Sequence, residues 1–287
     1  MNFGSINKYI KATIIALIIF LLLSFYLFLR RGYFDLYIAN KVFAGSSLIV
    51  LASVLLIGSL GRLYNIFDPW LAYRKHLGIL SFVLALLHGV ISLFFLPGRF
   101  TLNYFLTNYI TTGLGLISLI ILSYLFYISF DKFIGNMDKQ KWWSYQVWGS
   151  RIAGVLVFLH LVLMKYPGWI RWYQNGGSDE LVRPFMPPAS IIAAAFGFLV
   201  ILVRTSELIN QKLVKFLMPF LFAGLILFVG FSFALGKSKN PIALPIRWET
   251  CINLFGSRIQ ESSPPLCIAI DGRSVTMLPS LDLNEDK

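Results

Sequence analysis

The chain has 287 residues, of which 57% are hydrophobic and only 13% are charged. This composition excludes a pair of ordinary soluble domains and indicates a polytopic membrane protein. The formal net charge of +12 does not indicate nucleic-acid binding, because the Lys and Arg residues lie in short segments between apolar runs, where they contact lipid headgroups and set topology.

Seven apolar runs follow one another along the chain, and each has the composition of a transmembrane helix. A helix needs about 20 residues to cross a bilayer, so the fifth run must extend over Trp148, Gly149 and Ser150. The first run lacks a small-residue cleavage site, which indicates a retained helix. The expected spans are residues 13–29, 42–60, 77–96, 109–130, 152–164, 189–203 and 216–235.

These runs predict an all-α fold, a polytopic membrane helical bundle of about seven transmembrane helices with a small C-terminal tail. We expect an N-terminal stub at residues 1–12, a transmembrane domain at 13–235 and the tail at 236–287. The only cysteines, Cys251 and Cys267, lie in the tail and are expected to form a disulfide. Such a small segment needs a cross-link, because its large apolar residues are few: Trp248, Ile252, Leu254, Phe255, Ile259 and Leu266.

Basic residues and cysteines favour the same orientation. With the N-terminus in the cytoplasm, the inner segments hold more Lys and Arg residues than the outer ones. This orientation places the tail in an oxidising compartment, where a disulfide persists. We therefore expect a multi-pass protein of the plasma (inner) membrane, surrounded by lipid, with a cytoplasmic N-terminus and an extracytoplasmic C-terminus.

Two histidines, His88 and His160, are the only ionisable residues that lie inside the apolar runs away from their ends. An ionisable residue in hydrocarbon marks a functional site. His88 lies about 21 Å along its helix from Arg74, and His160 lies about as far past Trp143, so both fall at matching depth in the outer half. Two imidazoles on facing helices can ligate a haem iron. The alternative is that each histidine only forms a hydrogen bond with a neighbouring helix.

The sequence around these histidines resembles the ferric-reductase-like transmembrane family. Residues 74–88, RKHLGILSFVLALLH, are similar to its third helix in the spacing of a basic pair, a Leu-Gly and a histidine. The similarity continues through YITTG (109–113), SFDK (129–132), Trp143 and His160, covers roughly residues 48–203, and is closest to the haem-binding membrane subunit of the bacterial methionine sulfoxide reductase system. The resemblance implies a six-helix haem-binding core in which His88 and His160 ligate haem b.

This chain departs from the family members that hold two haems. Those members carry another histidine on the fifth helix, 13 residues before the outer one, where this chain has Val147. Arg74, 14 residues before His88, cannot ligate iron either, because its guanidinium stays protonated. One haem is therefore expected. The remaining histidine, His76, is expected to be a wetted side chain or headgroup contact at the inner interface.

Basic residues near the inner face have two interpretations. Arg74 and Arg151, with Lys75, Lys139 and Lys141, either bind a flavin phosphate or another anionic electron donor, or contact lipid headgroups. The pair Gly113 and Gly115 lies in an apolar run with no strand before it, which indicates helix packing.

The expected function is that of a transmembrane b-type haem electron-transfer protein. It would be an oxidoreductase membrane subunit without an NAD(P)H or flavin domain of its own. Electrons would come from a separate reductase or from quinol, with a flavin or quinone at the inner face as an optional second cofactor, and would leave to an extracytoplasmic acceptor. The alternative is a haem-free membrane scaffold or small transporter that presents the tail.

Overall fold

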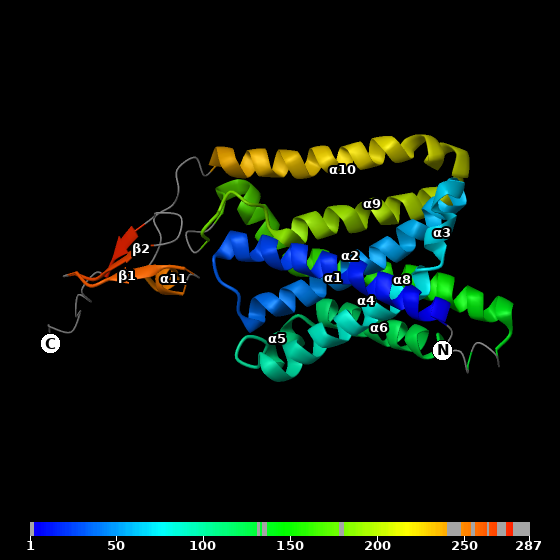
Figure 1. Cartoon of the computed structure of the whole chain (residues 1–287), viewed down its shortest axis with the longest axis horizontal. Coiled ribbons are helices and arrows are strands. Elements are labelled where there is room, and N and C mark those ends of the chain that lie inside the picture. Colours follow the sequence, from blue (N-terminus) through cyan, green and yellow to red (C-terminus); the bar gives the residue numbers. More distant parts are fainter. Residues whose placement is uncertain are drawn as a thin grey trace.

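The computed structural model describes residues 3–130, 133, 137–177, 181–239, 248–253, 256–262, 264–268 and 274–277. These residues form a bundle of long helices with a small sheet beyond one end (Figure 1). Seven helices in this part of the chain are long and apolar enough to cross a membrane, which confirms the all-α polytopic bundle. They are α1 (Phe3–Arg31), α2 (Leu36–Leu63), α4 (Arg74–Val90) with its π-helical continuation η2 (Ile91–Phe95), α6 (Tyr109–Tyr127), α8 (Lys139–Asn175), α9 (Ala189–Ile209) and α10 (Gln211–Lys239).

Side-chain caps set the start of several helices. The Asp35 carboxylate accepts a hydrogen bond from the Ile38 amide at 2.7 Å, and this cap begins α2. Asp138 caps α8 in the same way, so that this helix begins well before the predicted span 152–164 and runs for 37 residues. Between the spans, the described residues form three short helices: η1 (Asn65–Phe67), α3 (Asp68–Leu71) and α5 (Leu102–Thr107).

Helix α2 is the central helix of the bundle. It packs against α1, α4, α8 and α9, and 67% of the residues in its most apolar 18-residue stretch are buried. The helices α2, α4, α6 and α8 form a four-helix group in which α4 packs on α2 and α6, and α8 packs on the same two helices. Since α4 and α8 lie on opposite sides of this group, side chains on their inner faces point toward each other.

Large apolar side chains cover much of the outer surface of the bundle. Leu22 on α1, Ile117 on α6 and Ile226 on α10 are exposed, as lipid-facing residues are. The core is made of clusters between helices, one of which joins the four-helix group through Leu51, Phe82, Leu122 and Ala153.

The two ends of the bundle differ in what they carry. The chain begins at one end and leaves the last span at the other, where α1 ends, α2 begins and the C-terminal tail lies (Figure 1). We call the half next to the tail the tail-end half and the other the N-terminal half.

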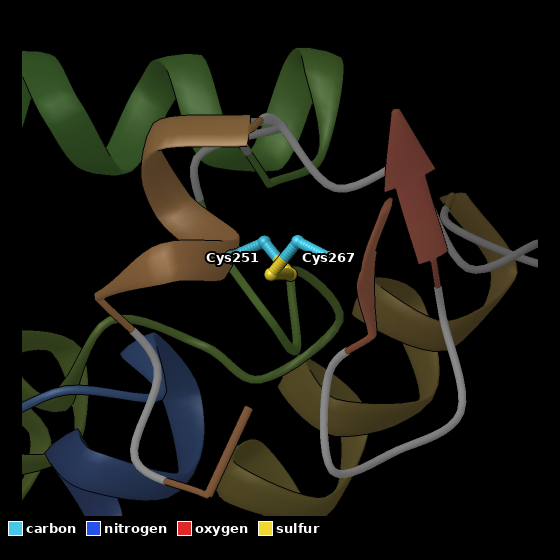
Figure 2. The surroundings of a disulfide bond; sticks show 2 residues. All are labelled: Cys251 and Cys267. Carbon is cyan, nitrogen blue, oxygen red and sulfur yellow. A yellow bond between two sulfur atoms is a disulfide. The ribbon is translucent and has the colours of Figure 1, made fainter. Parts of the chain in front are cut away.

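The tail contains α11 (Trp248–Ile252) and a three-stranded antiparallel sheet in the order β1 (Arg258–Gln260), β2 (Leu266–Ile268), β3 (Ser274–Thr276). The predicted disulfide between Cys251 and Cys267 is confirmed; it joins α11 to β2, and both cysteines are fully buried (Figure 2). Trp248, Val275 and Val182 pack on it. Since Val182 belongs to the loop between α8 and α9, the tail docks on the membrane domain.

Parts of the expected tail core lie elsewhere. Ile252 and Ile259, two of the few large apolar residues of the tail, are exposed, and the core is completed by Val182 from outside the tail. Leu254 and Phe255 lie outside the described residues. The loop that carries Val182 is held to α1, because Arg30 Nε donates to the Met186 carbonyl at 2.9 Å.

Candidate functional site

His88 lies near the end of α4 and contacts a buried asparagine of α2. Its Nδ1 is 2.8 Å from Asn40 Oδ1, and Asn40 Nδ2 donates to Ser92 Oγ at 2.8 Å. Because the amide nitrogen of Asn40 is used by Ser92, its oxygen faces the imidazole and accepts a hydrogen bond from Nδ1. This contact leaves the lone pair of His88 Nε2 available to a ligand.

His160 is held in the same way by α6. Its Nδ1 donates to the Thr111 carbonyl at 2.7 Å. The ring lies so close to α6 that a Cβ on Gly115 would be 3.0 Å from Nδ1, whereas a Cβ on Gly113 would have nothing within 4 Å. Gly115 is therefore the member of the predicted glycine packing pair that makes room for the histidine.

The two imidazoles thus share one arrangement, with Nδ1 bonded to a protein oxygen and Nε2 without a hydrogen bond among the described residues. Neither Nε2 is among the buried polar atoms that lack a partner, so both open onto accessible space. Metal-binding histidines usually have this arrangement, with the second ring nitrogen bound to an oxygen acceptor. Across the described ranges no group of three or more His, Cys, Asp or Glu residues forms a metal site, but an axial haem pair needs only two ligands.

A cavity of about 350 Å³ occupies the N-terminal half, between α2, α4, α6 and α8. Its walls combine apolar residues with polar groups and two indole rings. Val147, which stands where two-haem members of the resembling family have a histidine, is one of the lining residues. The polar and aromatic lining residues are Arg74, Lys75, Phe126, Ser129, Trp142, Trp143, Gln146 and Ser150.

The two predicted arginines of the inner face are not brought together. Arg74 lines the cavity, its Cζ lies 5.8 Å from the centroid of the Trp143 ring, and its Nε is buried without a hydrogen-bond partner. Arg151 does not line the cavity; its Cζ lies 5.1 Å from the ring centroid of Trp148 on the same helix. Of the two, Arg74 is therefore the residue that can contact a bound molecule.

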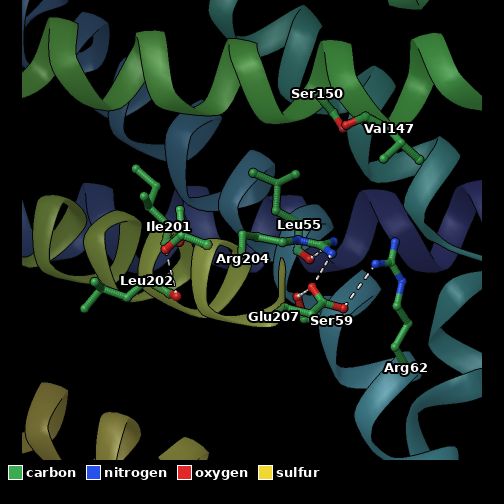
Figure 3. Close-up of polar contacts among 10 residues, drawn as sticks. Leu55, Ser59, Arg62, Val147, Ser150, Ile201, Leu202, Arg204 and Glu207 are labelled. Carbon is green, nitrogen blue, oxygen red and sulfur yellow. Dashed lines mark hydrogen bonds and ion pairs between the residues drawn. The ribbon is translucent and has the colours of Figure 1, made fainter. Parts of the chain in front are cut away.

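A buried charge network adjoins the cavity and was not predicted. Glu207 on α9 accepts hydrogen bonds from Ser59 at 2.9 Å, Arg204 at 3.0 Å and Arg62 at 3.1 Å (Figure 3). The Glu207 side chain is 1% exposed, and Arg204 also donates to the Leu55 carbonyl. The sequence signal was weak, because Arg204 and Glu207 sit at the end of an apolar run, where charges commonly face headgroups.

His76 differs from its expected role. It is 7% exposed, and its ring packs edge-on against Tyr9 of α1 with centroids 4.2 Å apart. The prediction of a wetted histidine is wrong because α1 covers this face of α4. Asp131 and Lys132 of the SFDK motif lie outside the described residues.

Comparison with known proteins adds no assignment: no family model matches the chain, and no curated protein sequence is similar to it.

Proposed function

We propose that this protein is a transmembrane electron-transfer protein of the ferric-reductase-like kind that holds one b-type haem between His88 and His160. When bound, the haem supplies a one-electron ferric/ferrous couple in the tail-end half of the bundle. The observation that carries the proposal is the shared arrangement of the two imidazoles, each with Nδ1 bonded to an oxygen and Nε2 open.

The surrounding residues support this role. Asn40 and the Thr111 carbonyl hold both imidazoles in the tautomer whose Nε2 can ligate iron, and they make that nitrogen a better donor. On the N-terminal side, the cluster around Phe82, Leu122 and Ala153 packs together the four helices that carry the histidines and the residues that bond to them.

We infer that the cavity in the N-terminal half binds the electron donor, either a quinol or a flavin. Indole rings and apolar walls suit a planar ring, and the guanidinium of Arg74, a lining residue, suits an anionic or carbonyl oxygen. About 14 Å of α4 separates Ile79 in the cavity wall from His88, and about 15 Å of α8 separates Ser150 from His160. Along the helix axes, the proposed donor site is therefore about equally far from His88 and from His160.

The donor proposal predicts that a soluble quinol reduces the haem of the purified protein, whereas NADH or NADPH alone does not. Arg74→Gln should slow reduction by quinol, and Arg151→Gln, whose side chain lies outside the cavity, should not. Rapid reduction by either nucleotide without added protein or flavin would contradict this proposal.

The haem itself is tested by the visible absorption spectrum of the purified full chain. We expect about one haem per chain with a low-spin spectrum, lost in His88→Ala and in His160→Ala and kept in His76→Ala. Size-exclusion profiles show whether each variant remains folded. A haem-free wild-type protein that also fails to bind added haem would support the scaffold or transporter alternative.

We also propose that the tail lies outside the plasma membrane and that the haem passes electrons on that side to an extracytoplasmic acceptor. The disulfide between Cys251 and Cys267 supports this orientation, since disulfides persist in oxidising compartments. A membrane-impermeant thiol reagent should label intact cells only after reduction. No labelling even after reduction would place the tail in the cytoplasm.

A further inference from the structure

Two lysines lie between the histidines and the tail. Lys41 follows Asn40, which holds His88, and Lys165 lies five residues after His160, on the tail side of it. Both are half-buried, and neither forms a hydrogen bond or ion pair with any other described residue. The Lys41 ammonium extends toward the tail and lies 3.8 Å from the centroid of the Tyr37 ring.

Among the described residues, the charged groups near these lysines are positive. The cations near Lys41 are Arg30, Arg31, Arg99 and Lys165, and no carboxylate of the described residues forms an ion pair with it. Lys165 is the one cation whose charge acts on both imidazoles. Asp35, the acid nearest to Lys41 in sequence, is used as the cap of α2. Half-buried cations without an anion are costly inside a membrane, so this arrangement is suited to an anionic ligand.

We propose that Lys41 and Lys165 bind the two propionate carboxylates of the haem, which therefore point toward the tail. The inference rests on the proposed function, because the histidines fix where the iron lies. Haem b carries its two carboxylates on one edge of the ring, so they can reach either the tail-end half or the N-terminal half.

Distance and charge select the tail-end half. Lys165 lies about 7.5 Å along α8 from His160, whereas Lys75, the nearest cation toward the other end of α4, lies about 19.5 Å from His88. Two ammonium groups facing two carboxylates also match in number and sign. Such charge-assisted hydrogen bonds are among the stronger polar contacts in proteins.

The test compares haem with its dimethyl ester, in which both carboxylates are masked. Both are titrated into the haem-free full chain in detergent. We expect wild type to prefer the free acid by about 100-fold, and Lys41→Gln and Lys165→Gln each to weaken free-acid binding by about tenfold without changing ester binding. Lys165→Arg should keep the preference. Lys237→Gln, an exposed lysine at the same end of the bundle, is the matched control.

The variant that combines Lys41→Gln with Lys165→Gln completes a double-mutant cycle and should bind free-acid haem and its dimethyl ester equally. The midpoint potential of the bound haem should also fall in Lys165→Gln, because a nearby cation favours the more negative reduced form, and should not change in Lys237→Gln. Equal binding of acid and ester by wild type would overturn the inference, as would lysine variants that weaken both ligands alike. Failure of the proposed function looks different, since binding of both porphyrins would then be absent or unaffected by His88→Ala.

Discussion

The two halves of the bundle differ in whether their buried cations have an anion within the chain. In the N-terminal half, Glu207 accepts hydrogen bonds from Ser59, Arg62 and Arg204, so both arginines are paired with a carboxylate, although Arg204 Nε is buried without a partner. In the tail-end half, Lys41 and Lys165 have no carboxylate partner among the described residues. The histidines beside them also keep one ring nitrogen open.

This difference separates a structural cluster from a binding site. A cluster in which buried cations are paired with a carboxylate loses stability when that carboxylate is removed. A set of cations and imidazoles that lacks partners gains from a ligand that supplies anions and a metal. The comparison therefore predicts that equivalent substitutions in the two halves have different consequences.

Removing the one carboxylate of the N-terminal network should have the largest effect on stability. Glu207→Gln keeps the shape of the side chain but leaves Arg204 buried without an anion, and we expect the free energy of unfolding to fall by about 3–5 kcal/mol. Unfolding in detergent micelles measures it. The control is Glu261→Gln, at an exposed position in the tail. A Glu207→Gln protein as stable as wild type would show that the network is not compensated by this carboxylate.

Removing the support of His88 should weaken haem binding without unfolding the protein. Asn40→Ala deletes the acceptor that orients the imidazole, and we expect about 10–100-fold weaker binding in a haem titration. Ser46→Ala, on the same helix, removes a buried hydroxyl that has no partner and should leave haem binding unchanged. Equal effects of the two substitutions would mean that Asn40 acts only through the packing of α2.

Hydropathy was sufficient to predict the spans, and the presence of only two cysteines, both in the tail, was sufficient to predict the disulfide. It did not predict helix ends: α8 extends far beyond the apolar run at 152–164, since polar residues continue the helix outside the bilayer. The one wrong site expectation, a wetted His76, arose because the packing of α1 on α4 depends on contacts distant in sequence.

The histidines could be selected from the sequence, but their orientation could not. The partner of His88 is Asn40, which precedes the predicted second span, and the partner of His160 is a backbone carbonyl, which leaves no sequence signal. The cavity and the network at Glu207 also come from the meeting of several helices. Pairwise contacts of this kind require the three-dimensional fold.

Filling the space that Gly115 leaves for His160 should have a smaller effect on haem binding, and Gly113 on the same helix provides the control. In Gly115→Ala the new methyl group lies 3.0 Å from His160 Nδ1, so the ring must shift by a few tenths of an ångström, and we expect several-fold weaker haem binding with a changed spectrum. Gly113→Ala has open space and should raise helix stability by up to about 1 kcal/mol. If Gly113→Ala alters the spectrum as much, helix propensity rather than the fit to His160 is responsible.

The smallest effect is expected at Lys41, and its sign is informative. In the haem-free protein, Lys41→Gln removes a half-buried cation that faces only other cations, which favours folding, and also its contact with the Tyr37 ring, which opposes it. We expect the free energy of unfolding to stay level or rise by up to about 1 kcal/mol, opposite in sign to Glu207→Gln.

Haem should reverse that sign. A ligand stabilises the folded state in proportion to the logarithm of its affinity, so a tenfold weaker haem site costs the Lys41→Gln variant about 1.4 kcal/mol at saturating haem. The variant is therefore expected to be at least as stable as wild type without haem and less stable with it. The control is Lys215→Gln, an exposed lysine whose Nζ lies 5.3 Å from the Tyr64 ring centroid in the N-terminal half; it should lose a few tenths of a kcal/mol in both states. Equal shifts for Lys41→Gln with and without haem would show that this lysine, like the network at Glu207, belongs to the structure alone.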